Sequence, residues 1–147
     1  MARVSRSRTV TAPPGDVWQL VSDPHRLPAW WPGVQRVEEA SPEAWTKVLS
    51  SPRGKTVRAD YTLLESEPER RLVWRQEVDE SPFERILSES TTEIELGPGG
   101  EGSTEVELTT RMRLRGFARL GVLQVRRAAG RQLDEALAGL EAALGEG

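Results

Sequence analysis

Apolar and polar side chains alternate through the middle of this 147-residue chain, from about residue 34 to residue 115. Successive side chains of a strand point to opposite faces, so this alternation predicts strands with one buried face. Short spacers rich in proline and glycine separate the runs, which favours antiparallel hairpins over helical crossovers. We predict strands at residues 3–12, 34–40, 44–51, 55–66, 70–78, 85–96 and 103–115.

The two ends of the alternating region are helical in pattern. Two short helices are predicted after the first strand, one beginning at Asp16 and ending before Pro24, and one from His25 to Trp31. A long helix is predicted at residues 117–144, because its leucines recur at helical spacing. Those leucines are Leu133, Leu137, Leu140 and Leu144.

This order predicts one α+β domain over residues 1–147, with a seven-stranded antiparallel sheet and two short helices after the first strand. Only the long C-terminal helix is large enough to cover the apolar face of the sheet. A strongly twisted sheet curls around such a helix. Any gap left between sheet and helix would be a cavity.

The strand at 85–96 carries an unusual polar stripe. The face that holds Ile86 and Ile94 also holds Ser88, Ser90 and Thr92. Buried hydroxyl groups need hydrogen-bond partners, so three in a row are unusual in a dry core. One interpretation is a ligand pocket, which is typically apolar with a few polar groups. The other is a register shifted by one residue, which would turn this face outward.

The inward positions of the strands and the apolar stripe of the long helix together define a predicted set of ligand contacts. For Arg126 the alternative is a side chain that extends into solvent. The set is Val57, Ala59, Tyr61, Leu63, Leu72, Trp74, Ile86, Ser88, Ser90, Thr92, Leu108, Thr110, Met112, Val122 and Arg126.

Composition excludes several kinds of chemistry. The chain has no cysteine and one histidine, so disulfides, thiolate metal sites and two-histidine metal sites are ruled out. We expect no metal and no cofactor. The run Gly97–Gly102 matches the dinucleotide-binding spacing, but a strand follows it where that motif requires a helix. It therefore predicts a hairpin turn.

Charge is balanced overall but uneven along the chain. The net charge of -3 gives no reason to expect nucleic-acid binding. Seven arginines and no acid lie between Leu108 and Leu133, whereas residues 65–107 are acidic. This asymmetry could mark a peripheral contact with an anionic membrane, in the arginine-rich segment 111–131. The preferred interpretation is cross-strand pairing between outward arginines and glutamates.

No apolar run is long enough to span a membrane, and no secretory signal precedes the first strand. We therefore expect a cytoplasmic protein, as a monomer or a homodimer.

Three N-terminal segments resemble the START-like superfamily, in particular its bacterial polyketide cyclase/dehydrase and lipid-transport branch. They are Ala12-Pro-Pro-Gly-Asp-Val-Trp18, Leu20-Val-Ser-Asp23-Pro24 and Leu27-Pro-Ala-Trp30-Trp31-Pro32-Gly33-Val34. The resemblance covers essentially the whole chain. It implies the helix-grip fold, in which the sheet curls around the C-terminal helix, and a lipid, polyketide or quinone-like ligand between them.

The resemblance leaves the activity open, because fold alone does not define function. The first hypothesis is a protein that binds a hydrophobic or amphipathic molecule. The second is a polyketide cyclase or aromatase, in which Tyr61, an arginine and hydroxyl groups would position a poly-ketone. His25 could act as a base at the cavity mouth, but the preferred interpretation is an exposed histidine in a loop or at a helix start. For Tyr61 the preferred interpretation is a core tyrosine whose hydroxyl bonds to the backbone. The third is a partner-binding protein, which an exposed apolar patch around Trp31 would favour. His25 and Tyr61 supply nearly all the acid–base capacity near neutral pH beyond carboxylates, which favours binding over catalysis.

Overall fold

The computed structural model describes residues 2–50 and 53–145. The strands are β1 (Ala2–Val10), β2 (Val34–Glu38), β3 (Ala44–Ser50), β4 (Thr56–Glu67), β5 (Arg71–Glu77), β6 (Leu87–Pro98) and β7 (Thr104–Leu114). The helices are α1 (Pro14–Val21), α2 (Leu27–Trp30) and α3 (Val122–Gly145), with 3-10 turns η1 (Pro24–Arg26), η2 (Pro82–Arg85) and η3 (Gly116–Gly121). The predicted order of elements is confirmed, although residue 51 of the third predicted strand lies outside the described residues.

The strands form one antiparallel sheet in the order β1-β7-β6-β5-β4-β3-β2. From β2 to β7 each strand pairs with the next one along the chain. The first strand instead pairs with the last, from Ala2 opposite Met112 to Val10 opposite Thr104. The glycine-rich run after residue 96 forms the turn between β6 and β7, as predicted, with Gly100 and Gly102 at positive φ.

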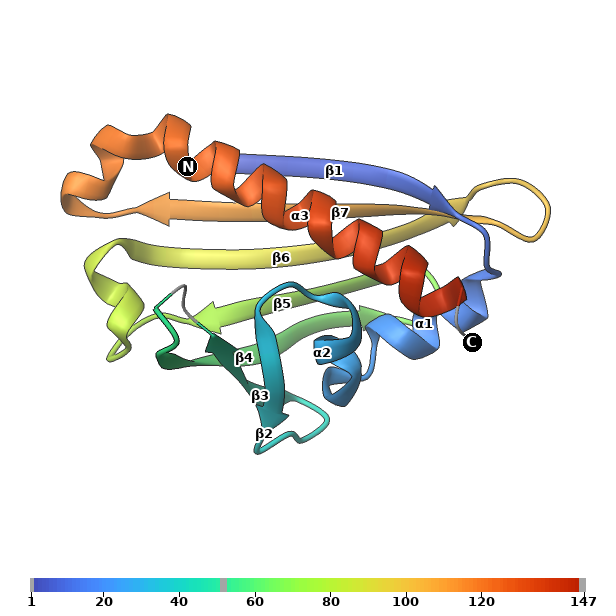
Figure 1. Ribbon diagram of the computed structural model, residues 1–147, viewed down its shortest axis with the longest axis horizontal. Helices are drawn as coiled ribbons and strands as arrows, with labels where there is room; N and C mark the ends of the chain where they lie inside the picture. Colours follow the sequence, from blue (N-terminus) through green and yellow to red (C-terminus); the bar gives the residue numbers. More distant parts are fainter. Residues whose placement is uncertain (1, 51–52, 146–147) are drawn as a thin grey trace.

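The long helix covers one face of this sheet. Figure 1 shows α3 lying obliquely across the strands, with its C-terminal end beside α1. Its leucines Leu133, Leu137 and Leu140 are at most 1% exposed, which confirms the predicted stripe. Near this end the helix approaches α2 closely: a Cβ added at Gly139 would lie 2.4 Å from the Trp30 carbonyl oxygen. Only glycine permits this approach without a backbone shift.

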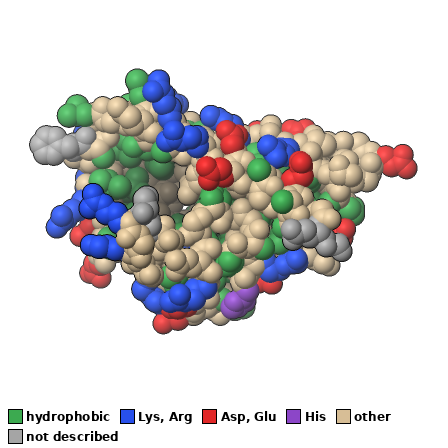
Figure 2. Space-filling model, viewed as in Figure 1, with side chains coloured by type: hydrophobic (Ala, Val, Ile, Leu, Met, Phe, Trp, Pro, Cys, Tyr) green, Lys and Arg blue, Asp and Glu red, His purple; other side chains and the backbone are tan. Residues whose placement is uncertain are grey.

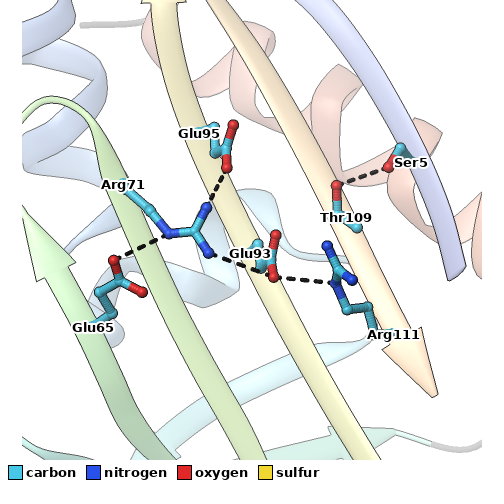
Figure 3. Close-up of polar contacts among 7 residues, drawn as sticks. All are labelled: Ser5, Glu65, Arg71, Glu93, Glu95, Thr109 and Arg111. Atoms are coloured by element: carbon cyan, nitrogen blue, oxygen red, sulfur yellow. Dashed lines mark hydrogen bonds and ion pairs between the residues drawn. The ribbon is translucent and has the colours of Figure 1, made fainter. Parts of the chain in front are cut away.

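The opposite face of the sheet carries cross-strand ion pairs. Arg71 of β5 contacts Glu65, Glu93 and Glu95, and Arg111 of β7 contacts the same Glu93 at 3.2 Å (Figure 3). Arg113 likewise pairs with a glutamate of β6. The predicted pairing of outward arginines with glutamates is confirmed for these side chains, and it fixes which face of β5–β7 is turned away from α3.

The predicted helix at 117–144 is wrong at its beginning. The chain leaves β7 through Gly116, whose φ of +62° belongs to the left-handed region that glycine adopts readily. Residues up to Gly121 then form the 3-10 turn η3, and the α-helix starts only at Val122. This late start leaves a separate turn at the end of the sheet, beside the first half of α3.

Candidate functional site

A cavity of about 550 Å³ lies between the sheet and the first half of α3. Its wall is mostly apolar, with Leu49, Phe83, Ile86, Leu87, Met112 and Leu114 contributed by the strands, η2 and the residue after it. Figure 2 shows a hollow on the face of the molecule near this half of the helix, with hydrophobic side chains inside it and basic side chains around it. The space is therefore open to solvent at one end.

Small side chains on α3 make the room for this cavity. Val125, Ala128, Ala129 and Gln132 line it. Their spacing of three, one and three residues places them on one face of the helix. The leucines that fill the interior begin at Leu133, the residue immediately after this set. The change from alanine to leucine along the same helix therefore marks where the cavity ends.

The sheet contributes polar groups to the cavity from three neighbouring strands. They are Gln76 of β5, Ser90 and Thr92 of β6, and Thr110 of β7. Thr92 pairs directly with Thr110 across the ladder, so the two side chains are neighbours on the same face of the sheet. Within residues 2–50 and 53–145 these four side chains form no hydrogen bonds with the protein. They are free to donate to or accept from a molecule in the cavity.

Lys47 of β3 places an amine in the cavity wall although its side chain is only 2% exposed. Its Nζ lies 4.2 Å from the ring centroid of Tyr61, 4.6 Å from that of Trp31 and 5.1 Å from that of Trp74. These distances are within cation–π range. Among the described residues no carboxylate and no hydrogen-bond acceptor contacts this Nζ. The amine thus faces aromatic rings and the cavity only.

Burial shifts the pKa values of the two ionisable side chains in the cavity wall in opposite directions. It lowers the pKa of Lys47 from 10.5 to about 7, because the charged amine loses its hydration. The aromatic rings oppose this shift in part, since ring faces attract an ammonium ion. Burial raises the pKa of Tyr61 above its ordinary value, so that phenol stays neutral and can donate a hydrogen bond.

An aromatic cluster holds this part of the wall in place. The Tyr61 ring stacks on Trp45, with 6.2 Å between the ring centroids. Trp45 in turn meets Trp74 edge to face, with 5.8 Å between their centroids. Trp31 meets Trp74 at the same distance, also edge to face. Such offset and T-shaped pairs are the favoured aromatic geometries. The rings around Lys47 are therefore fixed by one another as well as by the backbone.

The structure places six of the fifteen predicted ligand contacts in the cavity wall: Tyr61, Ile86, Ser90, Thr92, Thr110 and Met112. Contact with a ligand stays a prediction for all of them. The inward register proposed for the polar stripe of β6 is correct at Ser90 and Thr92.

Ser88 is the exception in that stripe. A register shift between Leu87 and Glu89 places Leu87 in the cavity wall. The Ser88 hydroxyl donates instead to the backbone carbonyl of Arg113, at 3.4 Å. A bulge of this kind changes the face on which the next side chain lies. Simple alternation across 86–92 therefore gave the wrong face for this one residue.

Seven other predicted contacts lie outside the cavity wall. Leu72, Trp74, Ala59 and Leu108 are buried within the core, and Leu63 lines a smaller pocket of about 80 Å³ with Leu72 and Trp74. Trp74 still reaches Lys47 with its ring. Val57 is half-buried, and Val122 is 37% exposed. The prediction that these side chains point inward was correct for most of them. However, side chains that point inward belong to the packed core as often as to the cavity wall.

Arg126 does not lie over the cavity. Its side chain is exposed, and its Nη2 donates to the backbone carbonyl of Arg3 at 3.3 Å. The predicted stripe through Val122, Arg126 and Ala129 was rotated away from the true one, which runs through Val125. The extension into solvent is therefore the correct interpretation for this arginine.

The structure also decides between the alternatives for His25 and Trp31. His25 is exposed and does not line the cavity, which agrees with the preferred interpretation of an exposed histidine. Trp31 is 6% exposed and lines the cavity, so this residue forms no exposed patch of the kind that would favour a partner-binding protein. The reason is that Trp31 follows the last turn of α2 in an extended conformation, which turns its ring inward against Trp74.

Sequence reasoning missed Lys47. The signal was present in the alternation of Trp45, Lys47 and Leu49 along β3, which places the lysine on the face of the tryptophan. Val48 obscured it, because this residue on the other face is also apolar and fully buried. Periodicity alone therefore gave no unique inward face for this strand.

Exposed leucines and arginines lie beside the cavity. Leu120 is 84% exposed and Leu123 is 65% exposed, at the junction of η3 and α3. Five arginines of the segment 111–131 form no ion pair within the described residues: Arg115, Arg119, Arg126, Arg127 and Arg131. A membrane contact of this segment stays a prediction. No helix in the described part of the chain is long and apolar enough to cross a bilayer.

The curled sheet, the long covering helix and the cavity between them define a helix-grip protein of the START-like class. The chain belongs to the family described as polyketide cyclase / dehydrase and lipid transport, whose model matches residues 1–145. The resemblance found in the sequence is thereby confirmed. No curated protein matches the chain by sequence.

Solved structures share the fold at low sequence identity. A START superfamily protein from Mycobacterium smegmatis matches with a TM-score of 0.77 and 15% identity, over 98% of this chain and 97% of its own. TTHA0849 from Thermus thermophilus matches with a TM-score of 0.76 and 24% identity, over 97% of both chains. The di-domain ARO/CYC protein BexL, from the BE-7585A biosynthetic pathway, matches with a TM-score of 0.81 and 22% identity, over 99% of this chain and 47% of its own.

Proposed function

We propose that the protein binds a hydrophobic or amphipathic small molecule, such as a lipid, a polyketide or a quinone-like compound, in the cavity under α3. The observation that carries this proposal is the cavity itself. Its volume of about 550 Å³ falls within the range of roughly 300–1,000 Å³ typical of small-molecule sites. Its apolar wall with a few unpaired polar groups has the usual composition of such sites.

Membership of a family named for cyclases and for lipid transport supports a ligand of this kind. The same cavity would also serve the alternative, a cyclase that acts on a bound poly-ketone. Two observations favour that alternative: Tyr61 lines the wall as a neutral phenol, and the amine of Lys47 lies beside it. Binding is common to both functions, so it is the property to test first.

The test is a substitution that fills the cavity, compared with one that does not. Ala129 is buried in the cavity wall on α3, whereas Ala138 is exposed on the same helix. The probe is N-phenyl-1-naphthylamine, an uncharged dye that fluoresces in apolar surroundings. We expect Ala129→Phe to weaken dye binding by about tenfold or more, a change of about 1.4 kcal/mol, because the new ring occupies the cavity.

Ala138→Phe should bind the dye like the unaltered protein. Circular dichroism of both variants verifies that the fold is retained. Equal dye binding by all three proteins would show that the dye does not enter this cavity, and would contradict the proposal.

A further inference from the structure

Lys47 combines three properties that seldom occur together in a lysine. Its amine is almost completely buried, it forms no ion pair or hydrogen bond among the described residues, and it lines a cavity with an open end. A buried charge normally has a partner, and a buried amine without one gives up its proton more easily. A neutral amine is a nucleophile.

The presence of a lysine at position 47, and not an arginine, also favours a role as a nucleophile. The chain contains 18 arginines and only two lysines, Lys47 and Lys55. For holding a carboxylate or phosphate, a guanidinium is the better group, because it stays charged and offers paired donors. It cannot become a nucleophile, whereas an amine can. A lysine at this position in so arginine-rich a chain therefore fits a role that needs a removable proton.

We propose that Lys47 forms an imine with an aldehyde or ketone group of the molecule that occupies the cavity. The inference rests on the proposed function in one respect, since the carbonyl compound must enter the cavity. It adds the chemical class of the ligand and a covalent step at a defined atom, Nζ of Lys47.

The surroundings of Lys47 keep other charges away from it. Tyr61 is the only other ionisable side chain among the described residues of the cavity wall. Lys47 lies opposite Val37 of β2 and Ala59 of β4, so the charged neighbours on these strands alternate to the other face. On that face the charged side chains of β2, β4 and β5 bond to one another or to threonines. Glu38 bonds to Arg36 and Arg58, Asp60 to Thr46, and Glu77 to Arg75 and Thr62.

The step balances without an oxidant or reductant. The lone pair of neutral Nζ forms a bond to the carbonyl carbon, and the carbonyl π electrons move to the oxygen, which gains a proton. That first proton comes from the nitrogen, which then gives its one remaining proton to the departing hydroxyl group. Water leaves, and a C=N bond results. Neutral donors in the wall, the Tyr61 phenol and the Thr92 and Thr110 hydroxyls, are available to bond the carbonyl oxygen.

The experiment traps the imine in the complete protein. The protein is incubated at pH 7 with decanal and cyanoborohydride, which reduces an imine to a stable secondary amine. Peptide mapping then locates the label among Lys47, Lys55 and the α-amino group. Because burial lowers the pKa of Lys47 to about 7, a large share of its amine is neutral at pH 7. We expect Lys47 to be modified at least about tenfold faster than Lys55, which is exposed.

Two controls separate this inference from the proposed function. Excess N-phenyl-1-naphthylamine should protect Lys47 from decanal while leaving Lys55 reactive. In the Lys47→Arg variant the label at position 47 should disappear, leaving only that of Lys55 and the α-amino group. The mapping on the unaltered protein needs no variant, so the result does not depend on how Lys47→Arg folds.

Normal dye binding with Lys47 unlabelled would overturn the imine and leave the binding function intact. The imine would also be overturned if decanoate displaced the dye below pH 7 and decanal still formed no adduct. That result would show that Lys47 acts as an ammonium group that binds anions. A failure of dye binding would instead count against the proposed function.

Discussion

The two halves of α3 cover the same sheet, but one half is packed against the interior and the other borders a cavity. The C-terminal half presents Leu133, Leu137 and Leu140, which are fully buried, and Gly139, which touches the backbone of α2. The N-terminal half presents Val125, two alanines and Gln132 to a cavity of about 550 Å³. The backbone is helical throughout, so side-chain size decides which part of the interior is packed and which is open.

This division lets one element serve two purposes. The packed half supplies stability, since buried leucines contribute about 2–5 kcal/mol each relative to alanine. The open half contributes less to stability and gives access to the polar groups of β5–β7. Lys47 lies on the open side, where it lowers stability and offers chemistry. Three sets of substitutions test whether the two halves differ in this way.

The largest expected effect is in the packed half. Leu137→Ala should lower the free energy of unfolding by about 4 kcal/mol, because it removes a buried side chain and leaves a void. Val125→Ala is the matched change in the open half, and it should cost less than about 1.5 kcal/mol because its side chain already borders empty space. Urea denaturation followed by circular dichroism measures both. Equal losses would show that the halves are packed alike.

The second effect comes from Lys47 and depends on pH. Its pKa falls from 10.5 in the unfolded chain to about 7 in the folded one, so the unfolded state binds more protons between these values. The stability of the protein should therefore rise with pH across this range, and the cost of Lys47 should be greatest below pH 7.

Lys47→Met removes this cost while roughly keeping the side-chain volume. The full pKa difference corresponds to about 5 kcal/mol, of which the cation–π attraction offsets part. We expect the variant to be more stable by about 3 kcal/mol at pH 6, with the gain disappearing above pH 10.5. Denaturation curves at several pH values measure it, and a gain independent of pH would contradict the assigned protonation change.

The smallest expected changes in stability come from alanine substitutions at Gly130 and Gly139, two glycines inside α3. Alanine is the better helix former by about 1 kcal/mol. At Gly130 the added Cβ meets only the end of the flexible Arg6 side chain, so Gly130→Ala should stabilise by up to that amount. At Gly139 it meets the Trp30 backbone, so Gly139→Ala should destabilise by about 2 kcal/mol. Thermal unfolding compares the pair, and stabilisation by both would refute the close packing of α3 on α2.

Much of the fold follows from the sequence because its signals are local. Alternation predicted the strands, and the spacing of Leu133, Leu137 and Leu140 predicted the buried side of the helix. The start of α3 was missed because residues 116–121 contain apolar side chains at helical spacing, while the conformation of Gly116 depends on how the chain leaves the sheet. Periodicity does not report such a tertiary constraint.

The site was less predictable than the fold. An inward position is visible in the sequence, but whether Tyr61 faces the cavity or Leu108 faces the core depends on side chains from distant strands. The bulge after Leu87 moved Ser88 out of the wall, and the buried residues on both faces of β3 concealed Lys47. The estimate of acid–base capacity therefore counted the exposed His25 and omitted the amine that lines the cavity.

The pairing of β1 with β7 has a consequence for how the protein folds. Ala2 lies opposite Met112, so this ladder joins segments separated by most of the chain. Closing a loop of about 100 residues costs about 2 kcal/mol more conformational entropy than closing one of about 10. Folds dominated by such distant contacts form slowly. The hairpins from β2 to β7 can form early, but β7 stays an open edge until the first strand returns to it.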